Sequence, residues 1–324
     1  RLAIVIVDNC LIGRNYIDNA KALAAKRTKI RGDRILVAAT HTHTAPPGKD
    51  RPTNRTDAAH RAYFNQLVNG IAEAIVQAEK NLAPAELAHG VALVPEEIFN
   101  RRWHMKPGGI ALNPFGKKND IVRMNPPRNL IERPAGPTDP EVHFISLRGT
   151  DGRPIALLAN YSLHYVGGIP ADGVSADYFG AFSGLIEKAV GKDAGFVAMM
   201  SNGTSGDINN INFQGPGKRQ PLYGQINFVA HKLADEVLRV QKKIKHHDWV
   251  ALKAAQKDVP LGVRRPGADE VARAKQMLKN AKDPKRLTTF EVYAQETLNL
   301  AKSPPRIPIP LQALHLGDLR ICGW

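Results

Sequence analysis

The sequence contains little cysteine and few aromatic residues. Cys10 and Cys322 are the only cysteines among 324 residues, and Phe, Trp and Tyr together make up 6%. Two cysteines are too few for the disulfide framework that stabilises many small secreted domains. No Cys-x-x-Cys pair is present to hold a metal. The two cysteines could form one disulfide only if the fold brought their segments together.

Long apolar runs are also missing. A membrane-spanning helix needs about 20 consecutive apolar residues, whereas the longest apolar stretches, at residues 2–7 and 196–200, have the length of buried strands. The content of 43% hydrophobic and 23% charged residues is ordinary for a globular protein. The chain is long enough for one large domain or two ordinary ones with a sizeable core.

Basic residues outnumber acidic ones, 45 to 30, which gives a formal net charge of +15. Such a surplus is compatible with nucleic acid, an anionic membrane surface or an acidic substrate. The basic residues are scattered, with a mild concentration at residues 232–253. No nucleic-acid motif and no basic stripe interleaved with aromatics is present. We therefore interpret the charge as a solvated surface and expect no nucleic-acid partner, while a polyanion-binding domain stays an alternative.

Strand-like and helical segments alternate along the chain. Amphipathic spacing of three and four residues predicts helices at residues 16–26, 57–81, 178–190, 221–244, 268–281 and 288–301. Apolar runs predict strands at residues 2–7, 34–40, 87–95, 142–148, 154–160, 195–200, 249–258 and 311–322. The alternation favours an α/β fold, a layered mixed β-sheet core flanked by helices. Long loops rich in proline and glycine, at residues 104–118, 124–140 and 303–310, are expected to help form a site.

A pair of histidines ends the predicted strand at residues 34–40. The segment reads Thr40-His41-Thr42-His43 and continues to a Pro46-Pro47-Gly48 turn. Residues two apart on a strand face the same side, so we expect His41 and His43 to point into one cavity. Such a pair can present imidazoles to zinc. Two histidines that only pack or form hydrogen bonds at a strand end would give the same pattern.

Three further segments place polar residues where apolar strands end. His164 follows the strand at residues 154–160. It is either a metal ligand or an ordinary buried histidine. Residues 201–210 are small and polar, and they form either a tight turn or a run of N–H groups that face an anion. Arg101 belongs to a surface arginine pair or, if it points into a cleft, binds a carboxylate or carbonyl oxygen.

These motifs, in this order, resemble those of the neutral/alkaline non-lysosomal ceramidase family over about residues 1–215. Thr40-His41-Thr42-His43 resembles the family's Thr-His-Thr-His signature, and Asn100-Arg101 resembles its Asn-Arg-Ser element. The segment that ends in His164 is similar to the strand that delivers the second zinc histidine. Gly206-Asp207-Ile208 resembles the Gly-Asp-Val that precedes the active-site serine. Residues 215–324 match weakly.

The resemblance implies a zinc-dependent hydrolase. We expect metal-activated water to cleave a ceramide-like N-acyl amide bond, with another amide or a sugar- or lipid-derived ester as alternative substrates. It makes His41 and His164 the zinc ligands. It gives His43 and Arg101 roles beside the metal, in contact with the substrate carbonyl or the tetrahedral intermediate. Spacing alone would have made His43 a ligand too. The resemblance also implies a small-molecule or lipid substrate, contact with a membrane surface, and a secreted or periplasmic location.

Two departures from the family pattern affect this interpretation. Asn209 takes the catalytic position of the family's serine, and an amide is not a nucleophile. One alternative is that activated water attacks directly. Otherwise the serine's role has either been lost or moved to another residue, and Thr204 and Ser205 are the nearby hydroxyls. A non-catalytic descendant that binds a ligand in the same cleft is therefore an alternative.

The second departure concerns the rest of the zinc shell. The family completes it with a glutamate and a tyrosine that follow a strand like residues 311–321. We therefore expect residues 1–324 to be a fragment of one ceramidase-like catalytic domain, without its C-terminal part and inactive by itself. Residues 266–303 are expected to be a helical insertion or peripheral hairpin within it.

Overall fold

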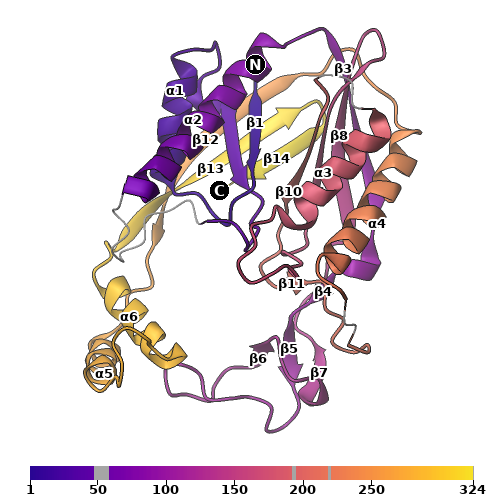
Figure 1. Cartoon of the computed structure of the whole chain (residues 1–324). Coiled ribbons are helices and arrows are strands. Elements are labelled where there is room, and N and C mark those ends of the chain that lie inside the picture. The colour runs from indigo at the N-terminus through magenta and orange to yellow at the C-terminus, as the bar shows by residue number, and fades with distance from the viewer. Residues whose placement is uncertain (47–57, 192–194, 218–219, 324) are drawn as a thin grey trace. The chain divides into compact units, whose positions relative to one another are not determined.

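The structure is a computed structural model that describes residues 1–46, 58–191, 195–217 and 220–323 (Figure 1). The chain divides into two compact units. The larger comprises Arg1–Arg101, Gly136–Ala255 and Gln312–Gly323, and the smaller comprises Arg102–Ala135 and Gln256–Leu311. All the site residues predicted from the sequence lie in the larger unit. Among the helices described, none has both the length and the apolar character that a membrane crossing requires.

A four-stranded mixed sheet forms the centre of the larger unit. The strands lie in the order β10 (Val197–Asn202), β9 (Pro154–Tyr161), β8 (Glu141–Gly149) and β3 (Ala85–Leu93). β10 is parallel to β9, whereas β9 and β8, and β8 and β3, are antiparallel.

Two helices cover one face of this sheet and form the main core with it. α3 (Asp177–Val190) packs against β10, and α4 (Gly224–Gln241) packs against β3 and β8 (Figure 1). Apolar residues recur in α4 at three- and four-residue steps, which places them on one buried stripe. Fully buried Phe144, Leu157 and Phe182 belong to the core between sheet and helices, and each such side chain contributes about 1.5–3 kcal/mol.

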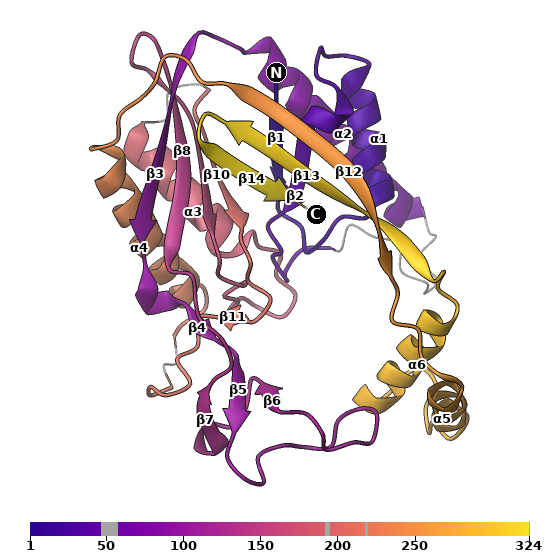
Figure 2. The ribbon, with the colours of Figure 1, turned by 180° about the vertical axis from the view of Figure 1, so that it is seen from behind.

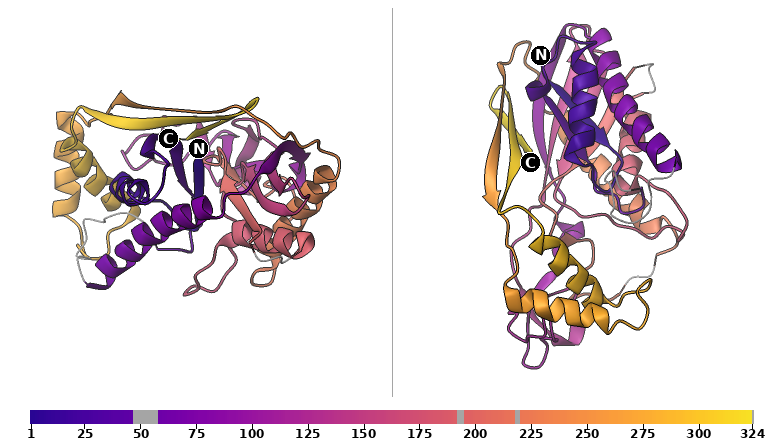
Figure 3. Two further views of the ribbon diagram at one scale, coloured as in Figure 1. Left: turned by 90° about the horizontal axis from the view of Figure 1, so that it is seen from above. Right: turned by 90° about the vertical axis from the view of Figure 1, so that its left-hand side faces the viewer.

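A second layered region surrounds β1 (Ala3–Val7) and β2 (Ile35–Ala39), which pair in parallel. α1 (Arg14–Ala25) and α2 (Ala58–Lys80) cover one face of this pair through a second apolar core. β10 contacts both strands, so the two sheets adjoin. Figures 2 and 3 show β13 (Arg306–Leu316) and β14 (Leu319–Gly323) over the other face.

The C-terminal strands complete this layer. β13 (Arg306–Leu316) is the middle strand of a three-stranded sheet in the order β12 (Leu252–Gly262), β13, β14. The side chain of Gln312 donates hydrogen bonds of 3.0 Å and 3.1 Å to the carbonyls of Asp33 and Ile35. The Gln312 amide therefore holds β13 against the start of β2.

The smaller unit contains a short sheet and a pair of helices. The sheet has the order β6 (Val122–Met124), β5 (Arg102–Met105), β7 (Ile131–Pro134). α5 (Ala268–Lys279) and α6 (Thr289–Ala301) pack against each other. α6 begins with a capping box, in which Thr288 and Glu291 satisfy each other's backbone N–H groups.

The α/β architecture predicted from the sequence is confirmed, and two details are wrong. The strand expected at residues 311–322 is a hairpin, because Gly317 adopts φ +62° and a turn there separates β13 from β14. Parts of the expected loops are strands, namely the end of β5, β7 and the start of β13. Each is short and pairs with a distant segment, so it leaves no local pattern. No disulfide joins Cys10 to Cys322, both of which lie in the described part of the chain. That residues 1–324 belong to one domain stays a prediction.

Candidate functional site

His41 lies beside the segment that follows β1. Because β1 and β2 are parallel, their carboxyl ends meet at one edge of the sheet. The N–H of His41 donates to the Asn9 carbonyl over 3.0 Å, and Nδ1 lies 2.7 Å from the Cys10 carbonyl oxygen. A carbonyl only accepts, so Nδ1 carries the proton and Nε2 keeps its lone pair. His41 therefore presents Nε2 as a ligand atom.

The prediction that His41 and His43 meet because they alternate along a strand is wrong, and a turn brings them together instead. They do not alternate along a strand, because β2 ends at Ala39 and both residues follow it. His41 instead adopts φ +68°, a left-handed conformation that is strained for a residue with a side chain. The turn places the two rings perpendicular, with centroids 4.7 Å apart. The Nε2 atoms of His41 and His43 lie 3.1 Å apart. Pro47 and Gly48, from the predicted turn, lie outside the described residues.

His164 reaches the same place from the end of β9. Its side chain is buried, and its Nδ1 lies 3.1 Å from the Ser205 carbonyl oxygen. By the same reasoning Nδ1 holds the proton and Nε2 is an acceptor. The ring centroid of His164 lies 4.7 Å from that of His41 and 5.1 Å from that of His43. The structure thus brings together three imidazoles from two strand ends.

The polar turn after β10 positions the partner of His164. Glycine is favoured at residue 203, because a Cβ there would lie 2.5 Å from the Ser162 Oγ and 3.2 Å from the Ser162 Cα. The N–H groups of Gly203, Ser205 and Ile208 are all donated to backbone carbonyls. These three N–H groups are therefore not directed at an anion, which was one interpretation of the sequence. Ser205 is buried, with its Oγ 3.4 Å from His164 Nδ1.

Asp177 fixes the loop that leaves His164. It is the first residue of α3, is buried, and has φ +56°. Its Oδ1 accepts the N–H groups of Val166 and Tyr178, and its Oδ2 accepts that of Gly167, over 2.7–2.9 Å. One carboxylate therefore joins the loop to the helix. Burial raises the pKa of the Asp177 carboxyl above its ordinary value of 3.8, although the three N–H groups act in the opposite direction.

Replacing Asp177 with asparagine is expected to destabilise the protein by about 1–3 kcal/mol, because the new NH2 group cannot accept all the N–H groups that the carboxylate accepts. The effect depends on pH. A carboxyl whose pKa is raised on folding takes up its proton first in the folded state, so its contribution to stability increases as pH falls through that pKa. The gap in unfolding free energy between wild type and Asp177→Asn should widen on acidification and level off below about 3.8. Urea denaturation of both proteins at several pH values measures this difference in unfolding free energy.

The exposed Asp172 provides the matched control. Asp172→Asn should leave the free energy of unfolding within about 0.5 kcal/mol of wild type at each pH. A gap for Asp177→Asn that narrows on acidification would contradict the assigned direction of the pKa shift.

Arg101 lies at the end of β4 (Phe99–Asn100), which pairs with β11 (Ile208–Asn209). Its backbone N–H donates to the Asp207 carbonyl over 2.7 Å. Its guanidinium donates to the Gly206 carbonyl through Nη2 at 2.6 Å and Nε at 3.2 Å. Arg101 is thus held by the same turn that orients His164.

The charge of Arg101 acts on two of the histidines. Burial, and then the nearby guanidinium, lowers the pKa of His164 from 6.5 to about 4. Burial lowers the pKa of His43 as well, helped by His41 and Arg101. His164 is therefore neutral near pH 7, which is the state that a metal ligand requires.

Asn209 is buried at the end of β11. Its Oδ1 accepts the N–H of Ile211 over 2.9 Å. This oxygen therefore belongs to the local turn, and whether Asn209 takes part in catalysis stays a prediction.

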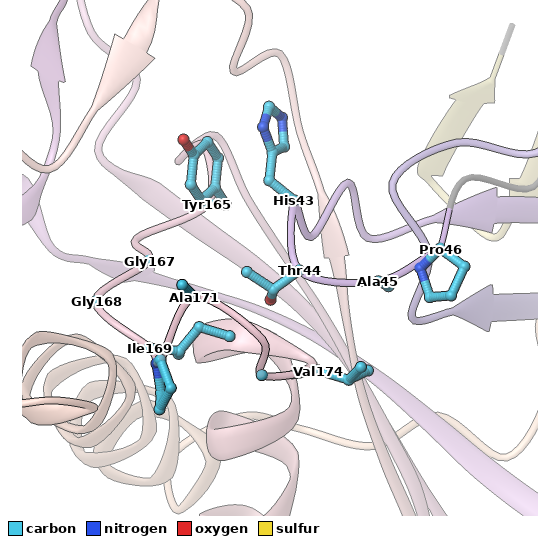
Figure 4. Close-up of a pocket in the computed structure, with 12 residues that line it drawn as sticks. His43, Thr44, Ala45, Pro46, Tyr165, Gly167, Gly168, Ile169, Ala171 and Val174 are labelled. Atoms are coloured by element: carbon cyan, nitrogen blue, oxygen red, sulfur yellow. The ribbon is translucent and has the colours of Figure 1, made fainter.

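A cavity of about 450 Å³ opens beside His43 (Figure 4). The ring of Tyr165 stacks on that of His43, with centroids 3.9 Å apart and an angle of 13°. The walls include the apolar side chains of Ile169, Ala171 and Val174. Neither Tyr165 nor these wall residues could be recognised as site residues from the sequence pattern, although Tyr165 directly follows His164.

Cys10 was also missed as a site residue. Cys10, His41 and His43 form a group whose potential ligand atoms all lie within 4.8 Å of one another. In the described part of the chain, no other group of three or more such residues meets this criterion. His164 is not in that group, although its ring adjoins both histidines. The sequence signal was weak. Cys10 follows β1 as His41 follows β2, and only parallel pairing places the two side by side.

The histidines fit a zinc site. His41 and His164 each direct Nδ1–H at a backbone carbonyl, which fixes the ring and leaves Nε2 for a metal. Burial and a depressed pKa keep His164 neutral. This donor set matches the preference of zinc for imidazole nitrogen.

Comparison with known proteins gives a consistent result. A family model described as neutral/alkaline non-lysosomal ceramidase, N-terminal, matches residues 1–222. The fold is similar to the crystal structure of neutral ceramidase from Pseudomonas aeruginosa, with a TM-score of 0.65 and 18% identity over 98% of this chain and 53% of that one. It is also similar to a structure described as ceramidase complexed with C2, with a TM-score of 0.64 and 17% identity over 98% and 54%. This chain spans about half the length of both. At these identities the likeness concerns the fold.

Proposed function

This chain belongs to the neutral/alkaline non-lysosomal ceramidase family, and we propose that it forms part of the active site of a zinc-dependent hydrolase. The bond cleaved is the amide of an N-acylated lipid of the ceramide class. The observation that carries the proposal is the convergence of the His41 and His164 rings, 4.7 Å apart, with both Nδ1 atoms bound to carbonyls.

His41 and His164 would hold the metal. Zinc, when bound, supplies Lewis acidity, which lowers the pKa of a water to about 7 and polarises a carbonyl group. The two residues have complementary environments. His164 is buried, whereas His41 lies at the edge of the site next to the more exposed His43. The pair can thus hold an ion between the core and the open side.

His43 is suited to exchange a proton with the substrate. It is the most exposed of the three histidines, borders the cavity, and has a depressed pKa. Its Nε2 lies 3.1 Å from the Nε2 of His41, next to the atoms that would hold the metal. His43 would take up the proton that the attacking water loses and pass it to the nitrogen of the departing amine.

Arg101 is suited to stabilise the negative charge that develops on the carbonyl oxygen. Its guanidinium is anchored on the Gly206 carbonyl, and its charge acts on both His43 and His164. A fixed cation that needs no rearrangement during the reaction is an effective source of transition-state stabilisation. Asn209 has no nucleophilic atom, so we assign the attack to water rather than to a side chain at this position.

The cavity beside His43 supports a lipid substrate. Its volume of about 450 Å³ and the apolar side chains of Ile169, Ala171 and Val174 suit an acyl chain. Tyr165 and His43 form a flat aromatic wall at the end nearest the imidazoles. We therefore place the acyl chain in this cavity and the amide at the histidines.

The test of the proposal is metal removal. The full-length protein, assayed with ceramides of short and long acyl chains, should lose at least about 100-fold in activity on dialysis against a chelator and regain it with zinc. Hydrolysis that resists the chelator would contradict zinc dependence. Zinc binding without hydrolysis of any N-acyl lipid would contradict the enzymatic proposal and favour a non-catalytic ligand-binding protein.

A further inference from the structure

The ring of His43 lacks the anchor that the other two histidines have. His41 and His164 each direct Nδ1–H at a backbone carbonyl. In the part of the chain that the structure describes, the ring of His43 makes one hydrogen-bond contact, of 3.1 Å between its Nε2 and the Nε2 of His41. That atom of His41 is the one that would bind the metal, so it cannot also orient His43 in the working site.

Tyr165 covers one face of this ring. The phenol and the imidazole lie nearly parallel, with centroids 3.9 Å apart and an angle of 13°, so their atoms are in van der Waals contact. Figure 4 shows the two side chains extending side by side from separate segments. The rings of His41 and His164 meet His43 at 90° and 64°. Of these three neighbours, Tyr165 is the one that is not assigned to the metal.

The backbone that follows Tyr165 fixes its position. The carboxylate of Asp177 accepts the N–H groups of Val166 and Gly167 over 2.9 Å and 2.8 Å. Gly167 adopts φ +74°, and a Cβ there would lie 3.3 Å from the Cε2 of Tyr165. The backbone therefore passes close to the phenol ring, which is half-buried. Because this ring is fixed, it can serve as a platform for a second ring.

The segment that carries His43 is tied to the other end of the same loop. The Oγ1 of Thr42 donates to the Ser175 carbonyl over 2.8 Å, and the N–H of Ser175 donates to the Thr44 carbonyl over 3.0 Å. These bonds hold the residues on either side of His43. Both partners of the stack thus have fixed backbones, and the freedom that remains to His43 is the orientation of its imidazole.

We propose that Tyr165 is a positioning residue, whose ring holds the imidazole of His43 toward the amide of the substrate. The inference rests on the proposed function and deepens it. His43 would serve two groups in succession, the attacking water and the departing amine, so its ring has to stay aimed at the reacting atoms. An error of about 1 Å in such a position can lower a rate by about 100-fold.

Replacing Tyr165 with leucine in the full-length protein tests this role by kinetics. Tyr165→Leu keeps an apolar wall but loses the flat ring, so kcat for a ceramide should fall about 10–100-fold while KM changes much less. The zinc content should stay at the wild-type level. Tyr165→Phe keeps the ring and should restore most of the lost kcat. Tyr293, exposed in the smaller unit, provides the matched control. Tyr293→Leu should leave kcat within about twofold of wild type.

Crystal structures of the protein grown with zinc give a readout that needs no activity. The imidazole of His43 should keep its orientation in Tyr165→Phe and turn or become disordered in Tyr165→Leu. An unmoved imidazole in Tyr165→Leu, an unchanged kcat, or a loss of zinc together with kcat would overturn the positioning role. The proposed function would stand in that case if wild type hydrolysed ceramides with zinc. A wild type without such hydrolysis would overturn the proposed function, and the crystal structures alone would then decide whether Tyr165 orients His43.

Discussion

Replacing His41 with alanine in the full-length protein is expected to remove bound zinc and, with it, hydrolytic activity. The variant loses the imidazole ring that the Cys10 carbonyl orients, and with it the Nε2 that would bind the metal. Of the two histidines that the family resemblance implies as ligands, only His164 remains. The expected loss in zinc affinity is greater than about 100-fold, because removing a group that only orients a ligand already costs about 10–100-fold. Atomic absorption after gel filtration measures the metal content, and the ceramide assay measures the activity.

His231 offers a matched control on the surface of α4. It is exposed, and its Nδ1 contacts the Asn227 carbonyl within the same helix. His231→Ala should keep the full zinc content, which separates loss of a ligand from loss of any histidine. If His41→Ala retained as much zinc as His231→Ala, the metal site proposed for this chain would be refuted.

The second large effect is expected at Arg101. Arg101→Gln should lower kcat by about 10²–10³-fold, the range found when a donor that stabilises an oxyanion is removed. The zinc content should stay at the wild-type level, because Arg101 contacts the Gly206 carbonyl and contributes charge rather than a ligand. Steady-state kinetics and metal analysis on the same preparation check both parts.

Arg102, the next residue, is exposed and serves as the control. Arg102→Gln should leave kcat within about twofold of wild type, since exposed substitutions usually change free energies by about 0.5 kcal/mol or less. Arg101→Lys should recover part of the activity, because it restores the charge without the planar two-donor contact. A loss of zinc in Arg101→Gln, or an effect on KM alone, would contradict the role in transition-state stabilisation.

The regular elements of this protein could be predicted from its sequence because their signals are local. In α4, for example, apolar residues at Ile226, Val229, Leu233 and Val237 recur with the period of a helix, and the helix forms where this period occurs. The strands β9 and β10 likewise follow short apolar runs. The short strands β6 and β7 gave no such signal, since each is stabilised by pairing with a segment distant in sequence rather than by its own pattern.

The sequence by itself determined the layered α/β architecture and the residue types that the site contains. The Thr-His-Thr-His segment and the strand before His164 also suggested which histidines meet, through resemblance to a family. Only the tertiary structure decided how they meet. The left-handed turn at His41 and the position of Cys10 beside it depend on contacts between segments far apart in sequence. The Asp177 carboxylate holds the loop after His164 through hydrogen bonds that the sequence pattern does not show. A linear sequence does not show the parallel pairing of β1 with β2, and it is this pairing that places a thiol next to two imidazoles.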